Sequence, residues 1–92
     1  MLVQIVDNQV IPEKKEAYVK AAKEFAQDAS ANDAGCLGMS VWLDIARPDH
    51  VFIISNWKDA ASMEASQSFL RHKKDLKPCF VGNTAAVLES AE

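Results

Sequence analysis

The chain has 92 residues, 49% hydrophobic and 25% charged, with a formal net charge of −3 at pH 7. This apolar content argues against intrinsic disorder, and the length suits a single domain over residues 1–92. The acidic balance and the lack of a basic face disfavour nucleic-acid binding. No apolar run approaches the length of a membrane span, and no secretory signal precedes the two cysteines. We therefore expect a cytoplasmic protein with reduced thiols and no membrane partner.

The first third of the chain predicts a strand followed by a helix. Residues 2–11 are rich in β-branched side chains, which favour a strand. Pro12 suits the first position of a helix. One stripe of that helix recurs at helical spacing and is expected to pack inward: Tyr18, Ala22, Phe25 and Ala29. Gly35 is expected to end this segment, because glycine readily takes a left-handed conformation.

Two further strands are predicted over residues 37–45 and 51–57, joined by a turn at residues 46–50. Both faces of the second of these strands are apolar, whereas a sheet with one wet face alternates apolar and polar residues. One face carries Val51, Ile53, Ser55 and Trp57, and the other carries Phe52, Ile54 and Asn56. A chain of this length can cover only one face with its own helices. The other face is expected to meet a partner chain, and which face does so stays open.

The last third predicts a helix in two pieces and a final strand. Asp59 is expected to cap a short helix, and Ser68 to cap a longer one that Pro78 stops. On the longer helix three residues share a face by their spacing: Phe69, His72 and Leu76. The final strand is expected over residues 84–88.

The predicted order is β-α-β-β-α-β, with the second helix broken. This is the ferredoxin-like arrangement of the α+β class, a four-stranded antiparallel sheet with helices on one face. The apolar uncovered face predicts a homodimer, since closed two-fold pairing is the commonest way to cover such a surface.

No familiar catalytic signature is present. The sequence has no glycine-rich phosphate loop, no Cys-x-x-Cys and no nucleophile elbow, so neither a nucleotide cofactor nor a structural metal is expected. His72 is the best acid/base candidate, because its neighbours place it on the buried side of a helix and imidazole exchanges protons near neutral pH. The alternative is a packing residue bonded to a backbone carbonyl. His50, in the predicted turn, is expected to be exposed.

The chain resembles the antibiotic biosynthesis monooxygenase family, part of the dimeric α/β-barrel group. The resemblance rests on residues 34–38 at the entry to the second strand, on Asp44, on residues 52–59 and on residues 76–78. It covers nearly the whole chain and implies two ferredoxin-like sheets paired as a dimeric α/β barrel. The family includes cofactor-free oxygenases of aromatic polyketides and quinols, haem-degrading enzymes and an isomerase of a signalling sugar.

The resemblance implies a cofactor-independent monooxygenase of a small aromatic or quinol-type substrate, held in a pocket between sheet and helices. The substrate would supply the electrons, and the protein a proton acceptor and donors that stabilise an oxyanion. Two alternatives stay open: a haem-binding or haem-degrading protein, and a non-catalytic dimer that binds small molecules.

Individual residues acquire roles through the resemblance. Asn8 stands where the haem degraders carry an Asn, but Ser66 stands where they carry a Trp. Trp57 matches a Trp of the polyketide-oxidising members, while their Asn four residues earlier is Ile53 here. The candidate catalytic residues are His72, Asn8 and Trp57, and the candidate substrate-binding residues are Trp42, Phe69, Met63 and Ser66. Structural alternatives stay open for four of them: a polar strand position for Asn8, core packing for Trp57 and Met63, and a dimer contact for Trp42.

Overall fold

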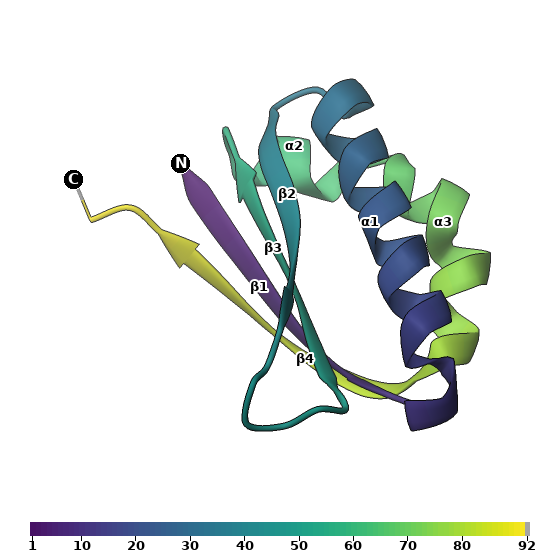
Figure 1. The fold of residues 1–92 in the computed structure, drawn as a ribbon. Helices are drawn as coiled ribbons and strands as arrows, with labels where there is room; N and C mark the ends of the chain where they lie inside the picture. The colour runs from purple at the N-terminus through teal and green to yellow at the C-terminus, as the bar shows by residue number, and fades with distance from the viewer. Residues whose placement is uncertain (92) are drawn as a thin grey trace.

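A four-stranded sheet with helices along one face forms the fold, seen in a computed structural model that describes residues 1–91 (Figure 1). The elements in chain order are β1 (Leu2–Val10), α1 (Lys15–Asn32), β2 (Cys36–Leu43), β3 (His50–Trp57), α2 (Ala60–Glu64), α3 (Ser68–Leu76) and β4 (Phe80–Glu89). Short 3-10 turns precede α1 and β4 at Pro12–Lys14 and Lys77–Cys79. The strands pair antiparallel in the order β2-β3-β1-β4, which confirms the predicted ferredoxin-like arrangement.

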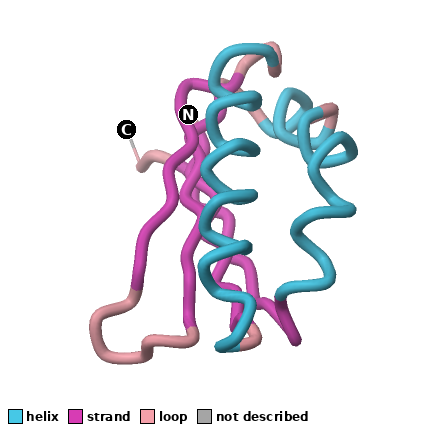
Figure 2. The backbone as a smooth tube through the Cα atoms, turned by 45° about the vertical axis from the view of Figure 1, so that its right-hand side comes forward, coloured by secondary structure: helices cyan, strands magenta, loops and turns pink. Residues whose placement is uncertain are grey.

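The helices lie on a single face of the sheet, as a second view makes clear (Figure 2). Strand register decides which residues meet them, because successive side chains alternate between faces. Asn8 is paired with Val51 and with Asn83, so these three residues share one face. Ile53 on that face is 7% exposed and belongs to the core. Ile54 therefore lies on the face that the helices leave uncovered.

The inward stripe predicted for α1 is confirmed. Its four residues are all buried: Tyr18, Ala22, Phe25 and Ala29. Two of them are alanines, whose small side chains let the helix backbone approach the sheet. Leu76 at the end of α3 completes the same core with Val51 of β3.

The connection from α1 to β2 contains the glycine expected there. Gly35 has φ +81°, in the left-handed region that side chains disfavour. A Cβ on Gly35 would also come within 2.2 Å of the Ser62 hydroxyl oxygen. Both the backbone conformation and the space therefore require glycine at this position.

The predicted cap of α3 is wrong. Ser68 is the first residue of this helix and is fully buried, and the residue before it makes no side-chain cap. The capping acceptor is instead Asp33, at the end of α1. Its carboxylate accepts the Ser68 backbone N–H at 3.3 Å, and it also accepts the hydroxyls of Ser68 and Ser66. Tertiary packing thus supplies a cap that no local pattern contains.

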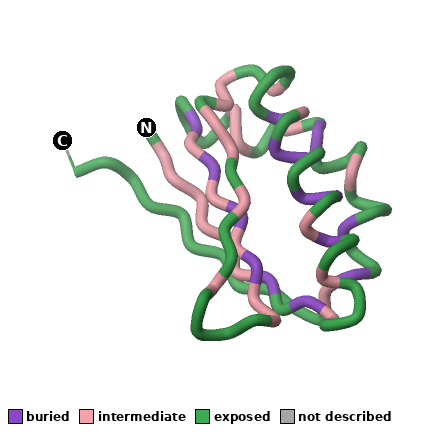
Figure 3. The backbone as a smooth tube through the Cα atoms, in the orientation of Figure 1, coloured by how far each residue is buried: buried purple, intermediate pink, exposed green. Residues whose placement is uncertain are grey.

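The last strand is longer than the predicted residues 84–88. It pairs with β1 from Phe80 to Glu89, with one irregularity near its start. Apart from Phe80 its residues are exposed (Figure 3), so burial gives it no alternating pattern. Main-chain pairing to β1, rather than side-chain chemistry, sets its length. Within residues 1–91, no helix combines the length and apolarity required to cross a bilayer.

Candidate functional site

A cavity of about 490 Å³ lies between the helices and the covered face of the sheet. This volume falls in the range of small-molecule sites. The middle of the cavity is apolar, with walls from β1, β3, β4, α1 and α3: Val6, Phe25, Ile53, Phe69 and Ala85. Phe25 and Phe69 meet edge-on, with ring centroids 6.0 Å apart. A flat apolar molecule is the natural occupant of such a space.

Polar side chains stand at both ends of this apolar stretch. Gln4 and Asn8 both line the cavity and lie four residues apart on β1, which is about 13 Å along a strand. Gln4 pairs with Ser55, and Asn8 pairs with Asn83. The cavity therefore offers hydrogen-bonding groups to oxygens at opposite ends of an elongated ligand.

Five of the seven residues predicted for the site line the cavity: Asn8, Trp57, Phe69, Met63 and Ser66. Trp57 is 1% exposed, and its indole N–H donates to the Ser55 hydroxyl at 2.8 Å. That bond fixes the plane of the indole at one end of the cavity.

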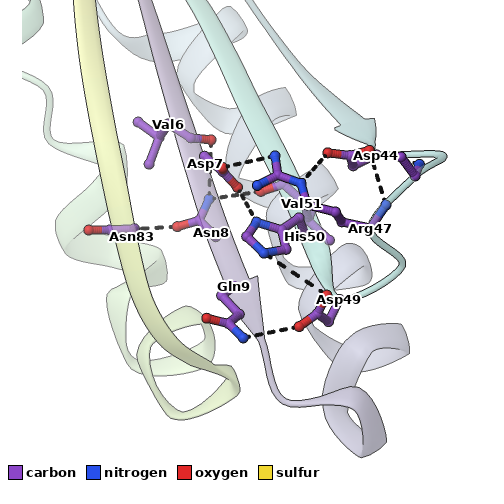
Figure 4. A network of polar contacts seen from close by, with 11 residues as sticks. Val6, Asp7, Asn8, Gln9, Asp44, Arg47, Asp49, His50, Val51 and Asn83 are labelled. Atoms are coloured by element: carbon purple, nitrogen blue, oxygen red, sulfur yellow. Dashed lines mark hydrogen bonds and ion pairs between the residues drawn. The ribbon is translucent and has the colours of Figure 1, made fainter.

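Asn8 is held by the sheet itself. It is 2% exposed, and its Nδ2 donates to the Val51 carbonyl at 3.2 Å (Figure 4). Its Oδ1 accepts from Asn83 Nδ2 at 3.4 Å. Both ends of the Asn8 amide are therefore engaged, and the amide of Asn83 is the more available one.

His72 does not face the cavity as expected. It lies where α3 contacts α1, with its Nε2 2.9 Å from an Asp28 carboxylate oxygen. Arg71 binds the same carboxylate with two hydrogen bonds, of 2.8 and 2.9 Å, and lowers the pKa of Asp28 far below its usual range. Each residue of an α-helix is rotated by about 100°, so three residues give 300°, which is 60° short of a full turn. His72 is therefore displaced by about 60° from Phe69 around the axis of α3, and this displacement directs its side chain toward α1 instead of the cavity.

Trp42 also lies outside the cavity. It is 56% exposed, and its indole N–H donates to the Ser40 hydroxyl at 2.8 Å. Trp42 pairs with Phe52, on the uncovered face of the sheet. Of its two predicted alternatives, a pocket wall and a dimer contact, the position is compatible with the second.

The structure adds cavity residues that sequence reasoning missed: Gln4, Tyr18, Glu64, Lys77 and Asn83. Periodicity places Tyr18 in the core stripe, and only its hydroxyl distinguishes it there, because a buried tyrosine normally needs a polar partner. Burial and the neighbouring Cys79 raise the pKa of Tyr18, so its phenol stays neutral. Asn83 was missed because it precedes the strand as predicted.

Haem fits these residues poorly. Among the described residues 1–91, those that line the cavity include no histidine and no cysteine, whereas haem iron is most often held by an imidazole or a thiolate. Ser66, at the position of the haem degraders' Trp, donates its hydroxyl to Asp33.

A second polar network lies on the uncovered face, at the β2–β3 hairpin (Figure 4). His50 is not exposed as expected: its side chain is 18% exposed, and its Nδ1 lies 2.7 Å from an Asp7 carboxylate oxygen. Arg47 bridges Asp7 at 3.3 Å and Asp44 at 2.9 Å. The pKa of Asp44 is lowered by the Ala46 N–H and by Arg47. These contacts join the hairpin to β1 and do not reach the cavity.

Comparison with known proteins agrees with this architecture. A crystal structure of an antibiotic biosynthesis monooxygenase superposes with a TM-score of 0.85 at 20% identity, over 100% of both chains. A conserved protein from Methanosarcina mazei gives 0.82 at 22% identity, over 96% of this chain and 91% of that one. A protein from Pseudomonas aeruginosa gives 0.82 at 21% identity, over 99% and 94%. These similarities concern the fold.

The sequence itself supplies the family. No curated protein matches the chain. The family model described as antibiotic biosynthesis monooxygenase matches residues 1–74, which include β1 to β3 and most of α3. This chain therefore belongs to the antibiotic biosynthesis monooxygenase family.

Proposed function

We propose that this protein is a monooxygenase that oxidises an electron-rich aromatic of the phenol or quinol class with dioxygen and without a cofactor. The observation that carries the proposal is the apolar, aromatic-lined cavity with hydrogen-bonding groups at both ends. Family membership supports the general activity. The spacing of the polar groups favours an elongated ring system that bears oxygen at its ends.

The chemistry balances without an external reductant. A quinol and one dioxygen give a hydroxyquinone and one water, so the substrate supplies all the electrons. Removal of a phenolic proton makes the ring electron-rich enough to pass one electron to dioxygen, and the two radicals then combine. The protein has to accept the proton, hold the ring and keep water away from the intermediate.

Among the described residues, Glu64 is the one carboxylate side chain that lines the cavity, and we assign it the role of proton acceptor. It ends α2, whose start is fixed by the Asp59 carboxylate accepting the Ser62 N–H at 2.8 Å. His72 is outside the cavity and already contacts Asp28, so it is not needed for this step.

Oxygen consumption by the purified protein tests the proposal, with 1,4-naphthohydroquinone and anthrone as substrates. We expect protein-dependent uptake that Glu64→Gln lowers by about a hundredfold. The matched control is Glu24→Gln, an exposed carboxylate that does not line the cavity. Uptake no faster than the uncatalysed reaction would refute the proposal. A large loss in His72→Ala with Glu64→Gln unaffected would return the proton acceptor to His72.

The alternatives predict other results. A haem protein would develop a Soret band with haemin, and a non-catalytic binder would bind aromatics saturably without oxygen uptake. The cavity residues are poor ligands for haem, which argues against a haem protein.

We also propose that the protein is a homodimer that pairs through the uncovered face of the sheet. This face has an apolar centre to which β1, β2, β3 and β4 contribute: Val3, Ile5, Trp42, Phe52, Ile54 and Leu88. Trp42 is 56% exposed and Leu88 is 53% exposed. A second copy offers the same apolar surface, and two-fold pairing would cover both at once.

A further inference from the structure

We propose that Tyr18 is a substrate-binding residue, whose hydroxyl donates a hydrogen bond to a phenolic oxygen at the Asn8–Asn83 end of the cavity. The inference rests on the proposed function and deepens it, because it assigns one end of the site to one group of the substrate.

The hydroxyl of Tyr18 is the feature that requires explanation. Tyr18 is 1% exposed and lines the cavity. Within residues 1–91, the Tyr18 hydroxyl has no protein hydrogen-bond partner. In the same residues, every side-chain nitrogen or oxygen atom that is completely buried has such a partner. The hydroxyl is therefore not completely enclosed, and we infer that it is reached from the cavity that Tyr18 lines. A buried tyrosine normally has a partner for its O–H, so this one is available to a ligand.

The surroundings hold this phenol in place and keep it neutral. Its ring packs edge-on against Phe80, with centroids 6.1 Å apart and planes at 80°. Burial and Cys79 raise its pKa, so it retains its proton throughout the physiological range. It can thus donate to a phenol oxygen, and donate more strongly to the phenolate formed during the reaction.

Asn83 supplies a second polar group to the wall of the same cavity. Phe80, which contacts Tyr18, is three residues before Asn83 on β4, and both Tyr18 and Asn83 line the cavity. One N–H of the Asn83 amide is directed to Asn8 Oδ1, which is itself oriented by the Val51 carbonyl (Figure 4). The other N–H and the carbonyl oxygen of Asn83 have no partner within residues 1–91. The Asn83 carbonyl oxygen can therefore accept a hydrogen bond from a phenol O–H, and its free N–H can donate one to a phenolate.

This arrangement predicts that the cavity binds aromatic rings with a hydroxyl group more tightly than rings of the same shape without one. A ring of the same shape without the hydroxyl would leave the Tyr18 hydroxyl buried and unpaired, which costs affinity. The preferred ligands are then phenols, naphthols and quinols rather than hydrocarbons.

The test uses 4-nitro-1-naphthol and 1-nitronaphthalene, an electron-poor pair that differs only in the hydroxyl, so that binding is measured without turnover. All proteins carry Trp42→Phe, which leaves Trp57 as the one tryptophan, and quenching of its fluorescence reports occupancy of the cavity. We expect Tyr18→Phe, which keeps the ring against Phe80, to weaken nitronaphthol binding about tenfold. Nitronaphthalene binding should change less than about twofold.

The absorbance of the bound naphtholate gives a second readout that packing alone would not move. We expect the pKa of bound nitronaphthol to rise by about one unit in Tyr18→Phe. Asn83→Ala, at an exposed position, should weaken nitronaphthol about threefold with the same ligand selectivity. Equal losses for both ligands, no loss for either, or no saturable binding of nitronaphthol would overturn the inference. Tyr18-dependent binding without oxygen uptake from quinols would overturn the proposed function alone.

Discussion

Replacing Asp33 by alanine should destabilise this protein strongly, although Asp33 is not among the described residues that line the cavity. Its side chain is 4% exposed and accepts hydrogen bonds from the hydroxyls of Ser66 and Ser68 and from the Ser68 backbone N–H. Ser68 is fully buried, so water cannot replace the lost acceptor. Hydrogen bonds to a charged group contribute about 1.5–3 kcal/mol, and an orphaned buried donor costs about 1–3 kcal/mol. Because these contributions overlap, we expect a loss of about 3 kcal/mol in unfolding free energy.

Urea unfolding measures this loss, followed by circular dichroism at a fixed protein concentration, since dimerisation would make stability concentration-dependent. Asp33→Asn keeps one acceptor oxygen and should lose about half as much. Asp28→Ala is the matched control, since it removes a carboxylate from the same α1–α3 contact at a more exposed position, and its loss should be smaller.

The pH dependence provides an independent check. Burial raises the pKa of Asp33, but the hydrogen bonds from Ser66 and Ser68 lower it by more, so that the net pKa is below its ordinary value of 3.8. A carboxyl whose folded pKa is depressed contributes stability above its unfolded pKa and loses it as the pH falls through the folded pKa. The unfolding free energy of the wild type should therefore fall as the pH drops below about 5. The unfolding free energy of Asp33→Asn should fall less steeply over the same acidic range. A loss of unfolding free energy below about 1 kcal/mol in Asp33→Ala would refute the reasoning. The same dependence of unfolding free energy on acidic pH in the wild type and in Asp33→Asn would refute it too.

Two further changes test the fold and its surfaces. Ile54→Lys should convert a dimer, measured by light scattering, to a species of 10.1 kDa, because it buries an unpaired charge in the proposed interface; a wild type that already has that mass contradicts the dimer. Ile53→Lys, at a core position, should prevent folding instead. Gly35→Ala should cost about 2 kcal/mol or more through its positive φ and the clash with Ser62, whereas Gly82→Ala, with nothing near its Cβ, should shift the urea midpoint little; equal losses would show that neither conformation nor space matters at Gly35.

Local periodicity predicted most of the fold. The stripe from Tyr18 to Ala29 recurs every three or four residues, and that spacing alone places it on the buried side of a helix. Gly35 likewise carries its own conformational signal. Apolar residues on both faces of β3 predicted that its uncovered face needs a partner, and that expectation still awaits a measurement.

The contents of the cavity were predictable only where residue type and spacing were enough. Trp57 and Phe69 are large aromatics, and both line the cavity, although Trp57 is buried and Phe69 is 39% exposed. His72 shows the limit of the argument. Its spacing from Phe69 places it at the edge of the buried face of α3. Its imidazole then contacts Asp28 on the adjacent helix α1, and this contact determines its orientation.

The sequence by itself determined the element order and the helix stripe, because each depends on a periodicity read along the chain. Tertiary structure alone decided that Ile53 meets the helices, that Asp33 caps a helix 35 residues away, and that Tyr18 and Asn83 border one cavity. These outcomes depend on strand register and on how far each helix is rotated about its axis. A shift of one residue or a fraction of a turn redirects a side chain, and no local pattern encodes that choice.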